Sequence, residues 1–195
     1  MKNNVYILDT ETTGLPKNYK AKVSDLDNWP RLVQFAAQTY SLDGRLLRQY
    51  TAIVKPVGYD IPKKASDIHG ITHERALAEG CRLQDVLQVI HEDITDAQII
   101  VGHNLIGYDY NILGSELIRA GFPTIRPPRK RIDTMLELIK FCNLRGAYGP
   151  KWPKLQEAHV KMFNREFEGA HDAMHDVKAT AAIFWEAVRR GIIEI

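Results

Sequence analysis

Apolar and polar positions along the chain follow first the period of strands and then that of helices. The apolar run Val5–Leu8 is typical of a strand buried on both faces. Residues 32–40 predict a second strand, and residues 46–54 alternate as a third. The dipeptide Asp43-Gly44 between the last two is a strong hairpin signal. The first quarter of the chain therefore predicts three strands that begin one sheet.

The connections around these strands carry fewer signals. Residues 15–30 predict a loop with one helical turn near residues 24–28. Residues 56–62 form a connection that begins and ends with proline. Thr72 is a suitable N-cap for a short helix through Ala78. We therefore expect one short helix between the third strand and residue 80.

Helical periodicity and short apolar runs alternate through the rest of the chain. The predicted elements are helix 83–94, strand 99–101, helix 109–120, an edge strand at 132–133, a helix capped by Thr134 through Cys142, a loop at 143–153, helix 155–163 and helix 172–189. This order predicts an α/β fold with a mixed sheet flanked by helices. Because no repeat, linker or low-complexity segment interrupts it, we expect residues 1–195 to form a single domain.

Composition narrows the class of protein. The 195 residues are 45% hydrophobic and 26% charged, which is typical of a soluble globular domain. The formal charge is only +2, so attraction to nucleic acid would come from local patches and metal ions. Cys81 and Cys142 are far apart without CxxC spacing, which predicts reduced thiols. No apolar run approaches the roughly eighteen residues of a membrane span, and the N-terminus lacks a signal-peptide core, so we expect a cytoplasmic protein without membrane contact.

Two acids follow the first predicted strand. Asp9 and Glu11 are two residues apart, so their side chains project from the same side of the strand. Like charges held together repel and raise each other's pKa unless a cation or a hydrogen-bonding shell compensates. Oxygen ligands of this kind suit Mg²⁺ and Mn²⁺. The alternative is that both acids simply cap a solvated strand end.

Three further groups stand at the ends of buried elements, where the crevice of a sheet would gather them. Asp109 lies in the first turn of its predicted helix, where the helix dipole alone also favours an acid. His171 and Asp176 lie near the start of the last helix. Four carboxylates suffice for two divalent ions, which about 4 Å apart clamp a phosphodiester. A neutral imidazole, with a pKa of about 6.5, can accept a proton from water.

Three segments together resemble a known family. Residues 9–14, 103–109 and 171–176 are similar, in order, to the three exonuclease motifs of the DEDDh 3′-to-5′ exonucleases. This DnaQ-like family includes the proofreading subunit epsilon of bacterial DNA polymerase III, and its members have a ribonuclease H-like fold. The similarity runs from Val5 to near the C-terminus, and His69–Thr72 also resembles a family segment beside the nucleotide pocket.

The resemblance implies a ribonuclease H-like mixed five-stranded sheet and assigns roles by position. The implied metal ligands, for two Mg²⁺ or Mn²⁺ ions, are Asp9, Glu11, Asp109 and Asp176, with His171 as general base. The residues implied at the terminal nucleotide are Thr12 (through its backbone), Leu15 (through its apolar side chain), His69, Asn104 and Tyr108.

Helix geometry alone does not select His171. Residues four apart share a helix face, which pairs His171 with His175 and Asp172 with Asp176. His171 can act with Asp176 only if it precedes the helix in a loop, and the family pattern implies that placement. His175 is then expected to be solvated, and Asp172 to cap the helix or serve as a first-turn acid.

The expected function is a metal-dependent 3′-to-5′ exonuclease that acts on single-stranded DNA, releases nucleoside 5′-monophosphates and serves proofreading or repair, with a DNA polymerase as a candidate partner. Three alternatives stay open: an exoribonuclease of the same family acting on short RNA, a non-catalytic polymerase-associated binding module, and an HD-domain phosphohydrolase. The last is suggested by the doublets His171-Asp172 and His175-Asp176, but such proteins are all-helical. The predicted strands argue against it.

Two segments carry open interpretations. The basic run Arg126–Arg131 would either follow a phosphate backbone or simply face water. Lys151–Lys154 is similar to a segment of some bacterial and phage family members. Its Trp152 would either stack on a base or pack within the protein.

Overall fold

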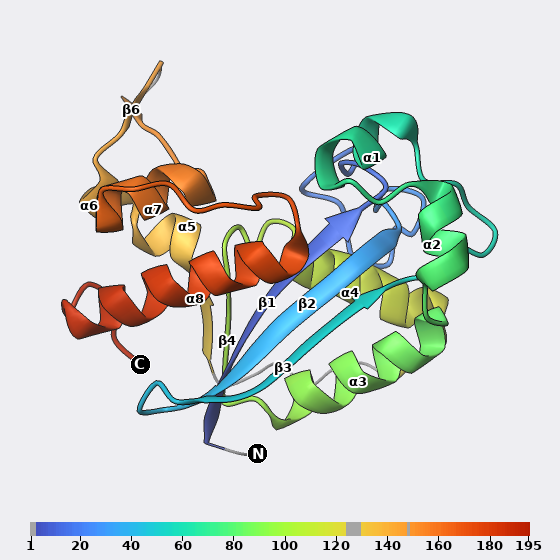
Figure 1. Cartoon of the computed structure of the whole chain (residues 1–195), viewed down its shortest axis with the longest axis horizontal. Helices are drawn as coiled ribbons and strands as arrows, with labels where there is room; N and C mark the ends of the chain where they lie inside the picture. The colour runs from blue at the N-terminus through green and yellow to red at the C-terminus, as the bar shows by residue number, and fades with distance from the viewer. Residues whose placement is uncertain (1–2, 124–129, 148) are drawn as a thin grey trace.

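A five-stranded mixed sheet forms the centre of the molecule, with strand order β3-β2-β1-β4-β5 (Figure 1). The computed structural model describes residues 3–123, 130–147 and 149–195. The strands are β1 (Asn4–Thr12), β2 (Leu32–Ser41), β3 (Leu46–Ile53), β4 (Ile99–Gly102) and β5 (Lys130–Asp133). β1 pairs antiparallel with β2 and parallel with β4. The expected α/β fold with a ribonuclease H-like five-stranded sheet is confirmed.

Helices cover both faces of this sheet. They are α1 (Lys63–His69), α2 (His73–Glu79), α3 (Leu83–Asp96), α4 (Asp109–Arg119), α5 (Thr134–Glu137), α6 (Ile139–Cys142), α7 (Leu155–Phe163) and α8 (Ala173–Arg189). α8 lies across β1 and β2 on one face, with α7 beside it, whereas α3 and α4 pack on the other (Figure 1). Each face therefore has its own apolar core.

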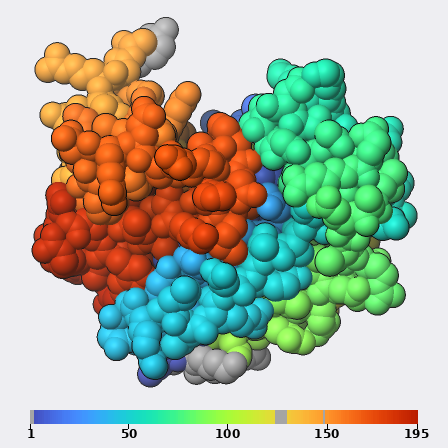
Figure 2. Space-filling model, viewed as in Figure 1, coloured from blue at the N-terminus to red at the C-terminus, as the bar shows by residue number. Residues whose placement is uncertain are grey.

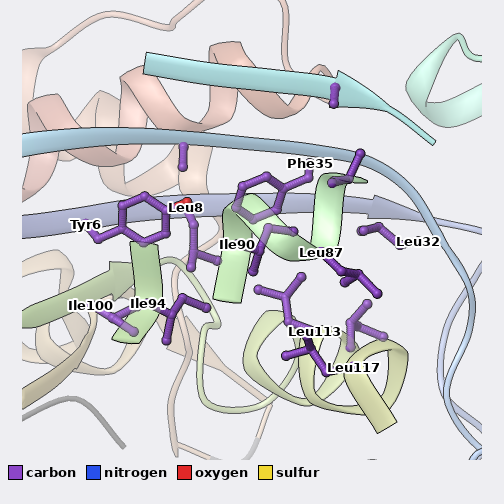
Figure 3. Close-up of a cluster of buried hydrophobic side chains, with 14 of the residues drawn as sticks. Tyr6, Leu8, Leu32, Phe35, Leu87, Ile90, Ile94, Ile100, Leu113 and Leu117 are labelled. Atoms are coloured by element: carbon purple, nitrogen blue, oxygen red, sulfur yellow. The ribbon is translucent and has the colours of Figure 1, made fainter. Parts of the chain in front are cut away.

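Side chains of β1 alternate between these two cores. Tyr6 and Leu8 belong to the cluster with α3 and α4 (Figure 3), whereas Val5 and Ile7 belong to the cluster with α8. Because successive side chains of a strand point to opposite faces, Asp9 and Glu11 continue the α8 face, and Thr10 and Thr12 continue the α4 face. The end of β1 thus presents acids to the N-terminal end of α8.

Helix α1 was not expected from the sequence. It follows Pro62, which makes no side-chain cap, and only Ala65 and His69 of its residues are buried. Its apolar contacts belong to a small separate cluster with Val33, Ile61, Ile71 and Ala76. Two buried positions in a helix of seven residues give too little hydrophobic periodicity to predict it from the sequence.

The predicted helix 134–142 is two short helices, α5 and α6. Leu138, fully buried, lies between them with φ −94° and ψ 3°, outside the helical range. The cap is Asp133 rather than Thr134, because the Asp133 carboxylate accepts a hydrogen bond from the Met135 N–H at 3.1 Å. The helix is interrupted at the point where Leu138 packs into the apolar core on the α8 side of the sheet.

Two predicted loops also differ in detail. Residues 24–28 form turns without a helix. The predicted loop 143–153 contains a small hairpin, β6 (Arg145–Gly146) paired with β7 (Gly149–Pro150). Residues 124–129 lie outside the described residues, and they include positions 126–129 of the basic run. Lys130 and Arg131 begin β5; the Lys130 ammonium donates to the Glu194 carbonyl, and the Arg131 guanidinium lies over the Tyr110 ring.

Both cysteines are free thiols, Cys81 exposed and Cys142 buried. Across the described ranges, the structure contains no helix long and apolar enough to cross a bilayer.

Candidate active site

The site forms where β1 ends at the centre of the sheet. Asp9 and Glu11 are partly buried there, and Glu11 lies opposite Gln34 of β2 in the strand register. Pairing with β2 continues through both acids, so the backbone that carries them is held in the sheet.

Asp109 reaches the end of β1 from α4, whose first residue it is. The chain leaves β4 through Asn104, which has a positive φ of 71°. The Asp133 carboxylate holds this turn, because it accepts hydrogen bonds from the Asn104 N–H at 2.9 Å and the Ile106 N–H at 3.0 Å. Thr10 then donates its hydroxyl hydrogen to Asp109 Oδ1 at 2.7 Å. The Asp109 carboxylate is therefore fixed against the strand that carries the other acids.

The N-terminal end of α8 supplies the remaining groups. Asp172 is the N-cap, and its carboxylate accepts from the Met174 and His175 N–H groups. Gln34 ties this end to β2, because its side chain donates to Asp172 Oδ2 at 3.4 Å and accepts from the Ala173 N–H at 3.2 Å.

His171 precedes α8 in a left-handed backbone conformation, with φ 70°. Its N–H donates to Asp176 Oδ2 at 3.1 Å, so the histidine and the first-turn acid share one side of the helix end. His175 instead contacts the Asp172 carboxylate at 3.2 Å, and about half of its side chain is exposed. The structure thus places His171, and not His175, beside Asp176.

The site groups come together in space. Ligand atoms of Glu11, His171 and Asp176 all lie within 4.8 Å of one another. Burial, followed by the negative charges of Asp109 and Asp176, raises the pKa of Asp9 well above its ordinary value. Glu11 therefore lies close to His171, just before α8, and to Asp176 in its first turn. The charges of Asp109 in α4 and Asp176 in α8 both act on Asp9.

The other three acids are perturbed in the same direction. Burial, then the charge of Asp176, raises the pKa of Glu11 to about 8. Burial raises the pKa of Asp109 to about 7, although the Thr10 hydroxyl opposes this. Burial also raises the pKa of Asp176 to about 6, against the effect of the His171 N–H. The folded protein therefore disfavours full ionisation of this cluster.

This donor set fits divalent cations. Within the described ranges, no lysine or arginine forms an ion pair with any of the four acids, and Asp176 Oδ1 is buried without a hydrogen-bond partner. Such a buried oxygen is costly unless a proton or a cation meets it. Hard oxygen donors with several negative charges are what Mg²⁺, Mn²⁺ and Ca²⁺ prefer.

A cavity of about 360 Å³ adjoins Glu11. The β1 end and the following turn line one side, and α1 lines the other through Lys64, Ile68 and His69. Figure 2 shows the surface hollowed between the α1 region and the C-terminal part of the chain, with N-terminal residues at the bottom of the hollow. The cavity walls are mainly apolar, so they suit a flat, partly apolar ligand.

Four of the five residues expected at a terminal nucleotide line this cavity: Thr12, Leu15, His69 and Tyr108. The Tyr108 hydroxyl contacts the Thr12 hydroxyl and donates to the Gly14 carbonyl at 2.6 Å. The Leu15 side chain is 74% exposed, and His69 is buried with its Nδ1 accepting from the Ile71 N–H. Asn104 is not among the lining residues, and its N–H is bound to Asp133.

Three polar residues that arrange this site had no role assigned from the sequence: Thr10, Gln34 and Asp133. Thr10 stands between Asp9 and Glu11 on the opposite face of the strand, and that alternation was a usable signal. Asp133 is the last residue of β5 and directly follows the buried Ile132, as Asp9 directly follows the buried Leu8. Gln34 is recognisable only from the register of β2 against β1, which the sequence does not specify.

A family model described as Exonuclease (RNase T) matches residues 6–184. The DNA polymerase III PolC-type of Ureaplasma parvum is 24% identical over 188 residues, which cover 93% of this chain and 11% of the polymerase.

Solved structures of exonuclease I share the fold. The Escherichia coli enzyme in complex with a dA16 oligonucleotide has a TM-score of 0.77 and 23% identity, covering 97% of this chain and 41% of the enzyme. Exonuclease I of Methylocaldum szegediense has a TM-score of 0.74 and 25% identity, covering 96% and 40%. The chain thus spans about a tenth of the polymerase and about two fifths of the nucleases.

Proposed function

The chain belongs to the RNase T exonuclease family, as a DEDDh exonuclease with the ribonuclease H-like fold, and on that premise we propose that it removes nucleotides from the 3′ end of single-stranded DNA. The products would be nucleoside 5′-monophosphates. We assign this activity to a single domain formed by residues 1–195.

The observation that carries the proposal is the convergence of four acids and His171 beside an open cavity. In this proposal the metal ligands are Asp9, Glu11, Asp109 and Asp176, and they hold two Mg²⁺ or Mn²⁺ ions. Such ions, when bound, supply hydroxide from water at neutral pH and stabilise charge on the leaving oxygen. The acids would therefore be ionised mainly in the metal-loaded protein.

His171 is the proposed general base. It stands outside the helix, next to Glu11 and Asp176, where it can accept a proton from water without a change in the α8 backbone. The terminal nucleotide would occupy the cavity, with the Thr12 backbone near the 3′ hydroxyl and the exposed Leu15 side chain against the base. His69, Asn104 and Tyr108 would support this pocket.

DNA is the favoured substrate because the similar proteins named above include a DNA polymerase and an exonuclease I crystallised with an oligodeoxynucleotide. A role in proofreading or repair, with a DNA polymerase as partner, follows from the same similarity.

The test is digestion of 3′-labelled and 5′-labelled DNA and RNA oligonucleotides with Mg²⁺ or EDTA. We expect the 3′ label to leave first as a mononucleotide, the 5′ label to remain on a shortening ladder, and EDTA to stop both. Efficient cleavage of circular single-stranded DNA would contradict the proposal. Faster digestion of RNA would favour the exoribonuclease, and binding without cleavage in Mg²⁺ would favour a non-catalytic module.

A further inference from the structure

The segment between α6 and α7 exposes a tryptophan. Trp152 is 61% exposed, whereas Trp29 is 3% exposed and lies in the core. The β6–β7 hairpin just before Trp152 projects above α7, across the end of β1 from α1 (Figure 1). An exposed aromatic face of this size is available to a ligand that stacks on it.

Hydrogen bonds on both sides hold the Trp152 backbone. The Lys151 N–H donates to the Leu144 carbonyl at 2.9 Å. Pro153 is buried, and its carbonyl lies 2.8 Å from His103 Nε2. The Lys154 N–H donates to Glu157 Oε2 at 2.8 Å. These hydrogen bonds fix the backbone that carries the indole. Binding of a ligand to the indole therefore costs little conformational entropy in this segment.

His103 connects this segment to the candidate active site. β1 and β4 run parallel, and His103 directly follows Gly102, the last residue of β4, so His103 leaves the sheet at the edge where β1 carries its acids. The carbonyl next to Trp152 is bound to the His103 ring. Trp152 therefore stands at the rim of the same sheet end that carries the acids.

The two sides of the hollow offer complementary chemistry. Leu15 and Ile68 expose 74% and 54% of their surface on the α1 side, facing a mainly apolar cavity. On the Trp152 side, Arg145 and Lys154 are exposed, and the charge of Lys154 helps to lower the pKa of Glu157. An exposed indole face combined with exposed cations matches a ligand that has flat bases and a phosphate backbone.

We propose that Trp152 stacks on a base of the single strand that leads into the site, upstream of the terminal nucleotide. Arg145 and Lys154 then contact the neighbouring phosphates. This proposal rests on the proposed nuclease function, and it adds a second binding contact with the strand, outside the cavity. Substrates long enough to reach Trp152 gain this contact, and a dinucleotide does not.

Kinetics of Trp152→Ala and Trp152→Phe test the proposal, with Leu47→Ala on β3, itself 50% exposed, as the control. On oligo(dT) of about ten nucleotides, Trp152→Ala should raise KM roughly 5- to 100-fold with little change in kcat, the range that base stacking on an aromatic ring gives. The KM ratio to wild type should fall as the substrate shortens towards a dinucleotide. Trp152→Phe should retain most of the affinity, because it keeps an aromatic face. Equal KM values for Trp152→Ala and wild type on the long substrate would overturn the proposal.

Intrinsic fluorescence gives a readout that does not need hydrolysis. The same oligo(dT), added in EDTA, should quench the emission of the wild-type protein. Trp152→Phe should bind labelled oligo(dT) with similar affinity, measured by fluorescence anisotropy, but should lose the quenching. The other two tryptophans should not report binding, because Trp29 is buried and Trp185 packs against Tyr40 and Phe184. Quenching that survives in Trp152→Phe would overturn the stacking contact. An inactive protein that still shows Trp152-dependent quenching would instead refute the nuclease function alone.

Discussion

The Asp176 carboxylate meets two different environments. One oxygen accepts the His171 N–H, and the other is buried without a partner. An unsatisfied buried oxygen destabilises a protein by about 1–3 kcal/mol, and more when it is charged. A bound cation would therefore stabilise the Asp176 carboxylate more than it would stabilise a carboxylate on the surface.

Asp176→Asn should remove a metal ligand and a negative charge without creating a cavity. We expect activity to fall more than about 100-fold, because even residues that only support metal ligands cost 10- to 100-fold. Thermal stability in EDTA should stay equal or rise, since repulsion within the cluster decreases. Thermal melts with and without Mg²⁺ should show that the variant has lost most of the metal-induced shift. Wild-type-like turnover would count against the assigned site.

The two histidines near α8 should respond differently to alanine. His171→Ala should lower kcat roughly 10²- to 10⁴-fold, the range for loss of a general base, with a small effect on the Mg²⁺ concentration needed for half-maximal activity. His175→Ala should change kcat little, because its ring is half exposed and hydrogen-bonds the Asp172 cap rather than one of the four site acids. The reverse ranking would assign the base to His175.

At the scale of elements, the strands, the main helices and their caps were predictable because each depends on local spacing. Thr72 caps α2 and Asp172 caps α8, as residue type and position indicated. Asp9 and Glu11 share a face because the strand period is two. In contrast, the break at Leu138 and the hydrogen bonds from the Asn104 and Ile106 N–H groups to Asp133 depend on contacts between distant segments, which local spacing does not encode.

The link between β2 and α8 is likewise a tertiary feature. Gln34 bonds both the Asp172 cap and the Ala173 N–H, so it positions the helix end that carries His171 and Asp176. Gln38, four residues along the same strand face, is similarly buried, and its Oε1 accepts the Tyr40 hydroxyl hydrogen. Substitution of Gln38 is therefore a suitable control for substitution of Gln34.

Gln34→Leu should destabilise the protein by roughly 1–3 kcal/mol and also lower kcat, because the α8 end loses two contacts. Gln38→Leu should affect stability similarly and leave kcat close to wild type. Denaturant melts and steady-state kinetics on both variants measure this difference. If both variants lose stability but neither loses kcat, Gln34 is structural only.

At the scale of the whole molecule, the acid cluster makes stability depend on pH and metal. Asp9 and Glu11 have pKa values raised by burial and by neighbouring acids, Glu11 to about 8. In metal-free protein the folded state therefore binds more protons than the unfolded state up to about pH 8, and stability falls as pH rises. Below about pH 6.5, His69 and His103 oppose this, because burial lowers the pKa of both rings.

We therefore expect the melting temperature in EDTA to decrease between pH 7 and pH 8.5, by about 2–4 °C for each kcal/mol lost. Mg²⁺ should raise the melting temperature more at pH 8.5 than at pH 6, since the ion must displace protons at low pH. Glu11→Gln should flatten the slope measured in EDTA. A melting temperature that rises with pH across this window would show that the acids are not coupled as described.

The left-handed backbone at residue 171 carries an implication for engineering. A non-glycine residue in that region is strained by about 1–3 kcal/mol, and asparagine tolerates it better than histidine does. His171→Asn should therefore melt at a slightly higher temperature and yet lose turnover, which differential scanning calorimetry beside a nuclease assay would detect. Under the proposed role of His171 as general base, this position trades stability for activity.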